Sequence, residues 1–186
     1  MSQIVHIPVL LNEVLEYLEI KNTDKVLDLT AGFGGHGSKI VNQLSSKGTY
    51  IGIDQDLTAV NYCKKLYSSK ENVFIEHLNY SDFPIALQKQ NITNIDKCLI
   101  DLGVSSHQFD DASRGFSHRE NATLDMRMNK EKNTLTAKDV VNSYSKSELS
   151  DIFYNYGELI HNKKLVENII SHRKKNKIQT TDELCE

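Results

Sequence analysis

The sequence has few cysteines and no long apolar run. Its three cysteines, Cys63, Cys98 and Cys185, are scattered over 186 residues and form no C-x-x-C pair. Such a set is typical of reduced thiols rather than of a disulfide framework. No apolar stretch approaches the roughly 20 residues that a membrane-spanning helix needs. The N-terminal stretch MSQIVHIPVLLNEVLEYL lacks the basic region of a secretion signal, so we expect a cytoplasmic protein without a membrane partner.

The chain also lacks an excess of positive charge. It holds 22 Lys and Arg against 25 Asp and Glu, a net charge of −3, which does not by itself indicate nucleic-acid binding. The charges are unevenly distributed, however. Residues 161–177, HNKKLVENIISHRKKNK, contain six Lys and Arg and one acid, Glu167. This stretch is either the solvated end of a helix or a surface that contacts phosphates, and composition alone favours the former.

No internal repeat and no low-complexity linker interrupts the chain. Instead, short apolar strands alternate with helical patterns in the first half, after a helix that Pro8 is placed to open. The strands are expected at 25–30, 49–54, 72–77 and 96–102, and the helices between them at 38–44, 57–67 and 84–90. Connections this short permit only local crossovers, which predicts an α/β fold with a parallel, doubly wound sheet.

The pattern changes after the fourth strand. Residues 103–133 are polar and irregular, and Ser145 with Glu148 then forms a capping box that marks the start of a helix. Three helical patterns are expected, at 136–144, 145–157 and 162–175. We therefore expect an α/β part over residues 1–104 and a helical segment over residues 105–186.

A glycine-rich stretch follows the first strand. LDLTAGFGGHGSKI, residues 27–40, contains Gly32, Gly34 and Gly37 in the pattern G-x-G-x-x-G. The pattern is found in loops that hold dinucleotides, but alone it is a weak indication. The strands around it end in polar side chains. Because the carboxyl ends of parallel strands meet at one edge of a sheet, these side chains should line one crevice.

Two carboxylates indicate which cofactor the loop would hold. Asp54 lies 20 residues beyond Gly34, the spacing of an acid that accepts hydrogen bonds from a ribose. Asp28 precedes the loop, where its charge would repel a diphosphate but suit the ammonium of a methionine moiety. Gly34 and Gly35 would let the backbone approach a small amino-acid tail. The loop thus fits S-adenosylmethionine better than NAD. A tight turn with a capping Asp28 and a solvated Asp54 is the alternative.

Several stretches together resemble the RsmH (MraW) family. They are HIPVLLNEVL, DLTAGFGGHGSKI, IGIDQD and, above all, DLGVSSHQFDDASRGFSHRENATLDMRMN at residues 101–129. Members are S-adenosylmethionine-dependent methyltransferases that act on N4 of a cytosine in the decoding region of bacterial 16S ribosomal RNA. The resemblance implies a Rossmann-like class I methyltransferase sheet with a helical insertion domain that recognises the substrate.

The resemblance also implies roles for matching positions. The residues that it assigns to the cofactor are Gly34, Gly35, His36, Asp54, Tyr80, Asp101 and Gln108. His36 could instead only cap its helix, and Tyr80 could belong to the core. Asp101, at the tip of the fourth strand, is the candidate catalytic residue. The amino group of cytosine is a poor nucleophile, and a carboxylate that accepts its N–H would localise the lone pair. A purely structural or cofactor-binding Asp101 is the alternative.

The remaining expectations concern the RNA. The side chains that could shape the pocket for an unstacked base are Ser105, Ser106, Arg114, Asp125 and Arg127, with Phe109 or Phe116 as a stacking face. The residues expected to contact RNA are Arg114, Arg127, Arg173, Lys174 and Lys175. No metal site is expected.

The chain departs from the family in two ways. Members often have Ser after Gly-Gly-His, where this chain has Gly37. Family chains are also much longer and return to the sheet with further strands. We therefore expect a C-terminally truncated member, in which residues 96–102 form an open sheet edge that promotes self-association and in which activity is reduced. The rival interpretations are a non-catalytic fragment that binds cofactor or RNA, and an NAD-dependent oxidoreductase.

Overall fold

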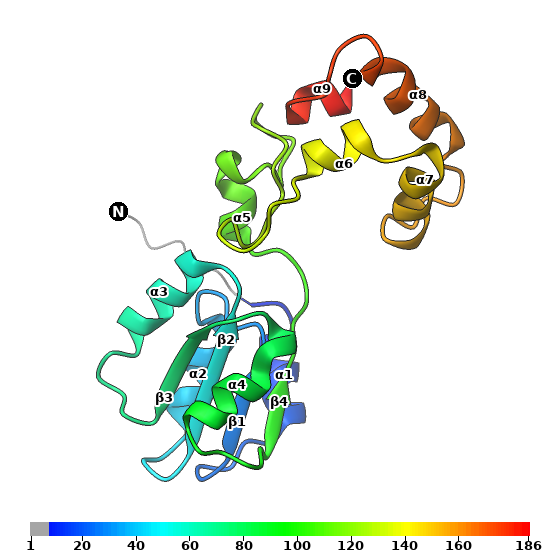
Figure 1. The fold of residues 1–186 in the computed structure, drawn as a ribbon. Helices are drawn as coiled ribbons and strands as arrows, with labels where there is room; N and C mark the ends of the chain where they lie inside the picture. The colour runs from blue at the N-terminus through cyan, green and yellow to red at the C-terminus, as the bar shows by residue number, and fades with distance from the viewer. Residues whose placement is uncertain (1–7) are drawn as a thin grey trace. The chain divides into compact units, whose positions relative to one another are not determined.

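The computed structural model describes residues 8–186, which divide into two compact units, one ending at Gly103 and one spanning Val104–Glu186 (Figure 1). The elements of the first unit are α1 (Leu11–Leu18), β1 (Lys25–Asp28), α2 (Gly35–Gln43), β2 (Thr49–Asp54), α3 (Leu57–Leu66), β3 (Val73–His77), the 3-10 helix η1 (Tyr80–Asp82), α4 (Phe83–Lys89) and β4 (Lys97–Leu99). The elements of the second unit are α5 (Ser106–Asp110), the 3-10 helix η2 (Ala112–Arg114), α6 (Ala137–Ser143), α7 (Lys146–Asn155), α8 (Lys163–Arg173) and α9 (Thr181–Cys185).

The first unit is built on a parallel four-stranded sheet in the order β3-β2-β1-β4 (Figure 1). In the central register, Leu27 of β1 lies beside Ile51 of β2 and Cys98 of β4. Side chains alternate along each strand, so Val26 and Tyr50 belong to one apolar cluster while Leu27 and Ile51 belong to another. The sheet therefore has an apolar layer on both faces.

Helices cover both of these layers. Residues of α1, α2 and α3 pack with Val26 and Tyr50, and residues of α4 pack with Leu27 and Ile51. Ile40 of α2 is fully buried, and burying a side chain of this size stabilises the fold by about 1.5–3 kcal/mol. The doubly wound α/β fold predicted from the alternation of strands and helices is confirmed.

Two helix starts differ from the prediction. Pro8 does not open α1, which begins at Leu11 after a turn; its ring instead lies against Gly35, where an added Cβ would come within 2.5 Å of the proline Cγ. The helix predicted from residue 38 begins earlier, at Gly35, because Gly34 with φ of 76° turns the chain directly into it.

The second unit is helical and has its own core. The buried residues of that core are Leu124, Val141, Leu149, Val166, Ile169 and Ile178. Its helices α5, α6, α7 and α9 begin at capping boxes, including the predicted one in which the Ser145 hydroxyl accepts from the Glu148 amide. Residues 103–133, predicted to be irregular, contain α5 and η2, because Ser105 and Gln108 form a further capping box. Within residues 8–186, no helix is long and apolar enough to cross a bilayer.

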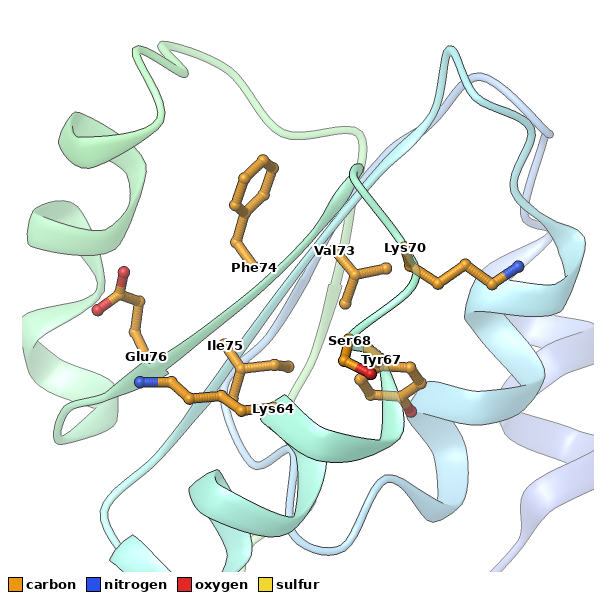
Figure 2. A pocket seen from close by; sticks show the side chains of 8 residues that line it. All are labelled: Lys64, Tyr67, Ser68, Lys70, Val73, Phe74, Ile75 and Glu76. Atoms are coloured by element: carbon orange, nitrogen blue, oxygen red, sulfur yellow. The ribbon is translucent and has the colours of Figure 1, made fainter.

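The β3 edge of the sheet is flanked by charged side chains. A pocket of about 270 Å³ lies along this strand and is lined in part by Lys64 and Lys70 (Figure 2). Figure 2 shows Lys64 extending across β3 toward the position of Glu76, whose carboxylate accepts a hydrogen bond from Lys89 Nζ at 2.6 Å. Charged side chains at an edge strand discourage pairing with a further strand.

The β4 edge has a different character. β4 is shorter than the predicted strand at 96–102, and among residues 8–186 it pairs only with β1. Two exposed residues after it are apolar, since Ile100 exposes 53% of its surface and Leu102 67%. The strand also carries the exposed thiol of Cys98 and the half-buried Lys97, and it is flanked by the exposed Asp96 and Asp101. An edge strand that continues into exposed apolar side chains is a template for another strand.

We therefore expect the chain to self-associate through β4. The double change Ile100→Lys and Leu102→Lys should shift the population toward the monomer, because charges at the edge oppose strand pairing. Sedimentation velocity measures the distribution. As a matched control, Ile85→Lys on α4, where the side chain is 47% exposed, should leave the association unchanged. A wild-type chain that remains monomeric at high concentration would contradict the prediction.

Candidate active site

A glycine loop joins β1 to α2 and turns at two residues with positive φ. Gly32 has φ of 51° and Gly34 has φ of 76°, both in the left-handed region that favours glycine. The Gly34 amide donates to the Ala31 carbonyl at 2.9 Å, and the Ser38 amide donates to the Gly34 carbonyl at 2.8 Å. The loop is therefore a tight turn that leads directly into the first turn of α2.

Asp54, the last residue of β2, holds this loop against the sheet. Its Oδ2 accepts from the Gly32 amide and its Oδ1 accepts from the Asp56 amide, both at 2.8 Å. Burial raises the pKa of Asp54, and the backbone hydrogen bonds from Asp56 and Gly32 oppose that rise. Each carboxylate oxygen can accept more than one hydrogen bond, so Asp54 can bind the loop and a ligand hydroxyl together.

Gly34 and Gly35 are required by the packing of the protein itself. A Cβ on Gly34 would lie 2.8 Å from the Tyr67 hydroxyl, and a Cβ on Gly35 would lie 2.5 Å from Pro8 Cγ. Close approach of a ligand is the reason for both glycines that the sequence pattern predicts. The structure supplies another physical reason, because side chains of α3 and of the segment before α1 occupy the space where Cβ atoms would be.

Gly37 makes room for a buried hydrogen bond. A Cβ at this position would lie 2.5 Å from the Tyr50 hydroxyl. That hydroxyl donates to Asp28 Oδ2 at 2.7 Å, and Asp28 Oδ1 accepts from the Thr30 amide at 3.0 Å. Gly37, the position at which this chain departs from the family pattern, therefore leaves the space that the Tyr50 hydroxyl occupies.

Asp28 does not line the crevice, and this corrects the sequence-based expectation. Its exposed fraction is 0%, and both of its oxygens accept hydrogen bonds from the protein. Burial raises its pKa to about 6, against the opposing hydrogen bonds from Tyr50 and Thr30. In this arrangement Asp28 supports the end of β1 and cannot contact a ligand ammonium directly.

Asp101 and His36 bring the end of β4 next to the start of α2. The Asp101 carboxylate is 52% exposed and lies 3.9 Å from His36 Nδ1, and the Asp101 amide donates to Thr30 Oγ1 at 2.8 Å. His36 is 8% exposed, and its Nε2 lies 3.1 Å from the Val9 carbonyl. When Nε2 donates to that carbonyl, Nδ1 carries a proton toward Asp101 only if the ring is charged.

Tyr80 lies just past β3, in η1. Its side chain is 46% exposed, so it is not the core residue that was the alternative interpretation. The segment is held by Asn79, whose side chain accepts from the Ser81 amide at 3.0 Å and donates to Gln55 Oε1 at 3.2 Å. The ends of β2 and β3 are thereby tied together.

Within residues 8–186, no group of three His, Cys, Asp or Glu side chains could hold a metal ion.

Gln108 belongs to the second unit and has a structural partner there. It is 4% exposed, its Oε1 accepts from the Ser105 amide at 3.0 Å, and its own amide donates to Ser105 Oγ at 3.3 Å. This reciprocal pair caps α5. Phe109, the next residue, is 42% exposed and remains available as a stacking face.

Arg114 and Arg127 bind the protein's own chain. Arg114 is 6% exposed, and its Nη2 donates to the carbonyls of Arg127 and Met128 at 3.2 and 3.0 Å. The guanidinium of Arg127 donates through Nε and Nη2 to Asp125 at 2.9 and 2.8 Å, and through Nη1 to the Asn133 carbonyl at 2.9 Å. Arg127 lowers the pKa of Asp125 to about 2. The geometry favours a structural role for both arginines over contact with RNA.

The basic stretch at the end of α8 is divided in a similar way. Arg173 Nη1 donates to the Val141 carbonyl at 2.8 Å, which ties α8 to α6. Lys174 and Lys175 follow it and are exposed. Of the three residues predicted here to contact RNA, Lys174 and Lys175 are therefore the ones whose charges are exposed at the surface.

The whole chain resembles proteins of one known family. A family model described as "MraW methylase family" matches residues 3–186. "Ribosomal RNA small subunit methyltransferase H" of Clostridium botulinum (strain Loch Maree / Type A3) is 46% identical over 181 residues, which cover 97% of this chain and 58% of that protein. The protein of the same description from Ureaplasma parvum serovar 3 (strain ATCC 27815 / 27 / NCTC 11736) is 42% identical over the same shares. The chain thus spans 58% of the length of these relatives.

Among solved structures, an RNA methyltransferase from Salinibacter ruber in complex with S-adenosyl-L-homocysteine has a TM-score of 0.34 to this chain. Its sequence is 20% identical, and the match covers 41% of this chain and 52% of that chain.

The buried Asp28 predicts a dependence of stability on pH. Burial raises its folded pKa from 3.8 to about 6, so between these values the folded protein holds a proton that the unfolded chain releases. The free energy of unfolding should therefore fall as pH rises from about 4 to about 6, and then level off. The full change is about 3 kcal/mol on the scale of 1.36 kcal/mol per pKa unit.

Asp28→Asn should remove this component, because the amide does not titrate. Urea unfolding at a series of pH values measures it, and the exposed Asp110→Asn should keep the wild-type slope. An Asp28→Asn protein with the wild-type slope would show that Asp28 is ionised throughout.

Proposed function

The chain belongs to the MraW methylase family, and from that premise we propose that it acts in S-adenosylmethionine-dependent methyl transfer to N4 of a cytosine in the decoding region of 16S ribosomal RNA. The matched relatives are described as methyltransferases of the ribosomal RNA small subunit. The observation that carries the proposal is the carboxylate of Asp54, which binds the glycine loop at Gly32 and retains lone pairs for ribose hydroxyls.

The residues at the strand ends fit S-adenosylmethionine. Asp54 suits ribose hydroxyls, and the exposed ring of Tyr80 suits an adenine. Asp101 is the exposed carboxylate beside the first turn of α2, which suits a cationic methionine end and would repel a diphosphate. When bound, S-adenosylmethionine supplies a methyl group that its sulfonium already activates.

Asp101 is also the candidate to act on the acceptor. Its carboxylate can accept the N–H of a cytosine amino group, which localises the nitrogen lone pair and receives the proton during transfer. The His36 ring lies 3.9 Å away at Nδ1, and in its charged form it would attract this carboxylate. The remaining contribution of the protein is alignment of the acceptor nitrogen with the methyl group.

The proposed partner is the ribosomal RNA of the small subunit, in the cytoplasm. Lys174 and Lys175, exposed beyond α8, are proposed to contact its phosphates. Arg173 would support them through its bond to the Val141 carbonyl. We do not propose RNA contacts for Arg114 and Arg127, because their donors serve the fold of residues 114–133.

Calorimetry and a methylation assay test the proposal. S-adenosylhomocysteine should bind the chain, whereas NADH should not, and tritiated methyl groups should pass from S-adenosylmethionine to small ribosomal subunits. Binding of NADH, or of neither ligand, would contradict the proposal. Because the chain spans 58% of its relatives, binding without transfer would favour the non-catalytic alternative.

Asp54→Ala should weaken the binding of S-adenosylmethionine by roughly 1.5–3 kcal/mol, since the ribose hydroxyls lose a charged hydrogen-bond acceptor. The variant also frees the Gly32 amide, so a thermal melt of each protein should accompany the calorimetry. Asp151→Ala removes an exposed carboxylate on α7 and should leave the affinity unchanged. Equal affinities in wild type and Asp54→Ala would remove Asp54 from the site.

Changing Lys174 and Lys175 together to Ala should lower the affinity of the chain for RNA of any sequence. The slope of log affinity against log salt should flatten by about 0.7–0.9 for each lost phosphate contact. Filter binding over a range of salt concentrations measures the slope. Lys70→Ala, near β3, serves as the control. A slope that does not change would identify the two lysines as the solvated end of a helix.

A further inference from the structure

The connection between α7 and α8 exposes large apolar side chains. Tyr156 exposes 85% of its surface, Ile160 72%, Tyr154 56% and Leu159 46%. Figure 1 shows the connection joining the two helices; we call it the α7–α8 corner and define it as residues 154–164. Single exposed apolar residues are normal on a protein surface, whereas several together indicate an interaction site, and these four lie in one short segment.

The backbone of the α7–α8 corner is held in a fixed turn. Asn162 is buried; its Nδ2 donates to the carbonyls of Ser150 and Leu159 at 2.9 and 3.0 Å, and its Oδ1 accepts from Ser150 Oγ at 2.8 Å. The Leu159 amide donates to the Phe153 carbonyl at 3.0 Å. The exposed side chains are therefore displayed by an ordered turn rather than by a frayed helix end.

Exposed cations follow the apolar side chains. Lys163 and Lys164 begin α8, and neither forms a salt bridge with another residue of the described range 8–186. The corner contains one carboxylate, Glu158, so its net charge is positive with neutral histidine. Farther along α8, Glu167 is already paired with Lys146 at 2.7 Å.

The chemistry of the corner suits a single-stranded polyanion with flat, apolar groups. Aromatic rings beside lysines bind single-stranded nucleic acid, because bases stack on the rings while the cations meet phosphates. A protein partner would be expected on a surface from which charges are depleted, and here two exposed lysines follow the tyrosines in the same short segment of the chain. Charge and aromatic content together favour RNA.

We propose that the α7–α8 corner binds single-stranded RNA, with Tyr154 and Tyr156 stacking on bases and Lys163 and Lys164 contacting phosphates. The proposal rests on the proposed function, which supplies RNA as the substrate class, and it adds a contact surface outside the methyl-transfer residues. Its energetic basis is stacking, which tolerates any base because every base has a π-face.

Fluorescence anisotropy with a labelled single-stranded RNA oligonucleotide of decoding-region sequence tests the stacking. Tyr154→Ala and Tyr156→Ala should each weaken binding roughly 5- to 100-fold. Tyr154→Phe and Tyr156→Phe keep the ring and should bind within about twofold of wild type. Tyr17→Ala is the matched control, because Tyr17 lies on α1 and is 86% exposed.

The salt dependence separates the two kinds of contact. Lys163→Gln and Lys164→Gln should each flatten the slope of log affinity against log salt by about 0.7, the value for single strands. The tyrosine variants should keep the wild-type slope, because stacking releases no counterions. A tyrosine variant that flattens the slope while retaining affinity at low salt would contradict the assignment.

Unchanged RNA affinity in both alanine variants would overturn the proposal. Reduced self-association in the tyrosine variants, with RNA affinity unchanged, would assign the corner to a contact between copies of the chain and would also overturn it. S-adenosylhomocysteine binding and methyl transfer are measured on the same preparations. If the tyrosine variants bind RNA normally and methyl transfer persists, the RNA-binding role of the corner is rejected but the proposed function is not. If the corner binds RNA but the chain does not bind S-adenosylhomocysteine, the proposed function is rejected but the corner's role is not.

Discussion

The hydrogen bond from the Gly32 amide to Asp54 Oδ2, at 2.8 Å, is the constraint on which the site depends. It joins the loop after β1 to the end of β2, and a backbone bond from the Ala31 amide to the Ile53 carbonyl at 2.9 Å runs beside it. Parallel pairing brings these strand ends together, so the sheet and the loop form one rigid unit. The loop can then turn at Gly34 and start α2 at a fixed place.

Buried polar contacts underneath the loop add to this constraint. The Tyr50 hydroxyl reaches Asp28 through the space left by Gly37, and Tyr67 Oη lies 3.2 Å from Ser38 Oγ. Each group is bonded to another protein group, as a buried polar side chain must be to avoid a desolvation cost. The charges left exposed at this edge of the sheet are those that a ligand can meet, and Asp101 is one of them.

Local patterns in the sequence predict the fold well. Alternation along β1 and β2, short connections and the capping box of Ser145 with Glu148 each depend on residues close in the chain, and the structure contains all of them. Such local patterns do not predict which residues far apart in the chain pack against each other. Only the three-dimensional structure reveals that Asp28 is buried with a hydrogen bond from Tyr50. The same holds for the backbone carbonyls that accept hydrogen bonds from Arg114. The glycine pattern identified the loop, but the need for Gly34 and Gly37 comes from Tyr67 and Tyr50, side chains that lie farther along the chain.

Hydrogen–deuterium exchange of the loop amides tests the central claim most directly. The account predicts that S-adenosylhomocysteine slows exchange at Gly32–His36 and in the turn after Asp54, because these backbones would line the proposed binding site. NADH at the same concentration should leave their exchange unchanged. Protection by S-adenosylhomocysteine elsewhere in the chain with none at the glycine loop, or equal protection by NADH, would contradict the account.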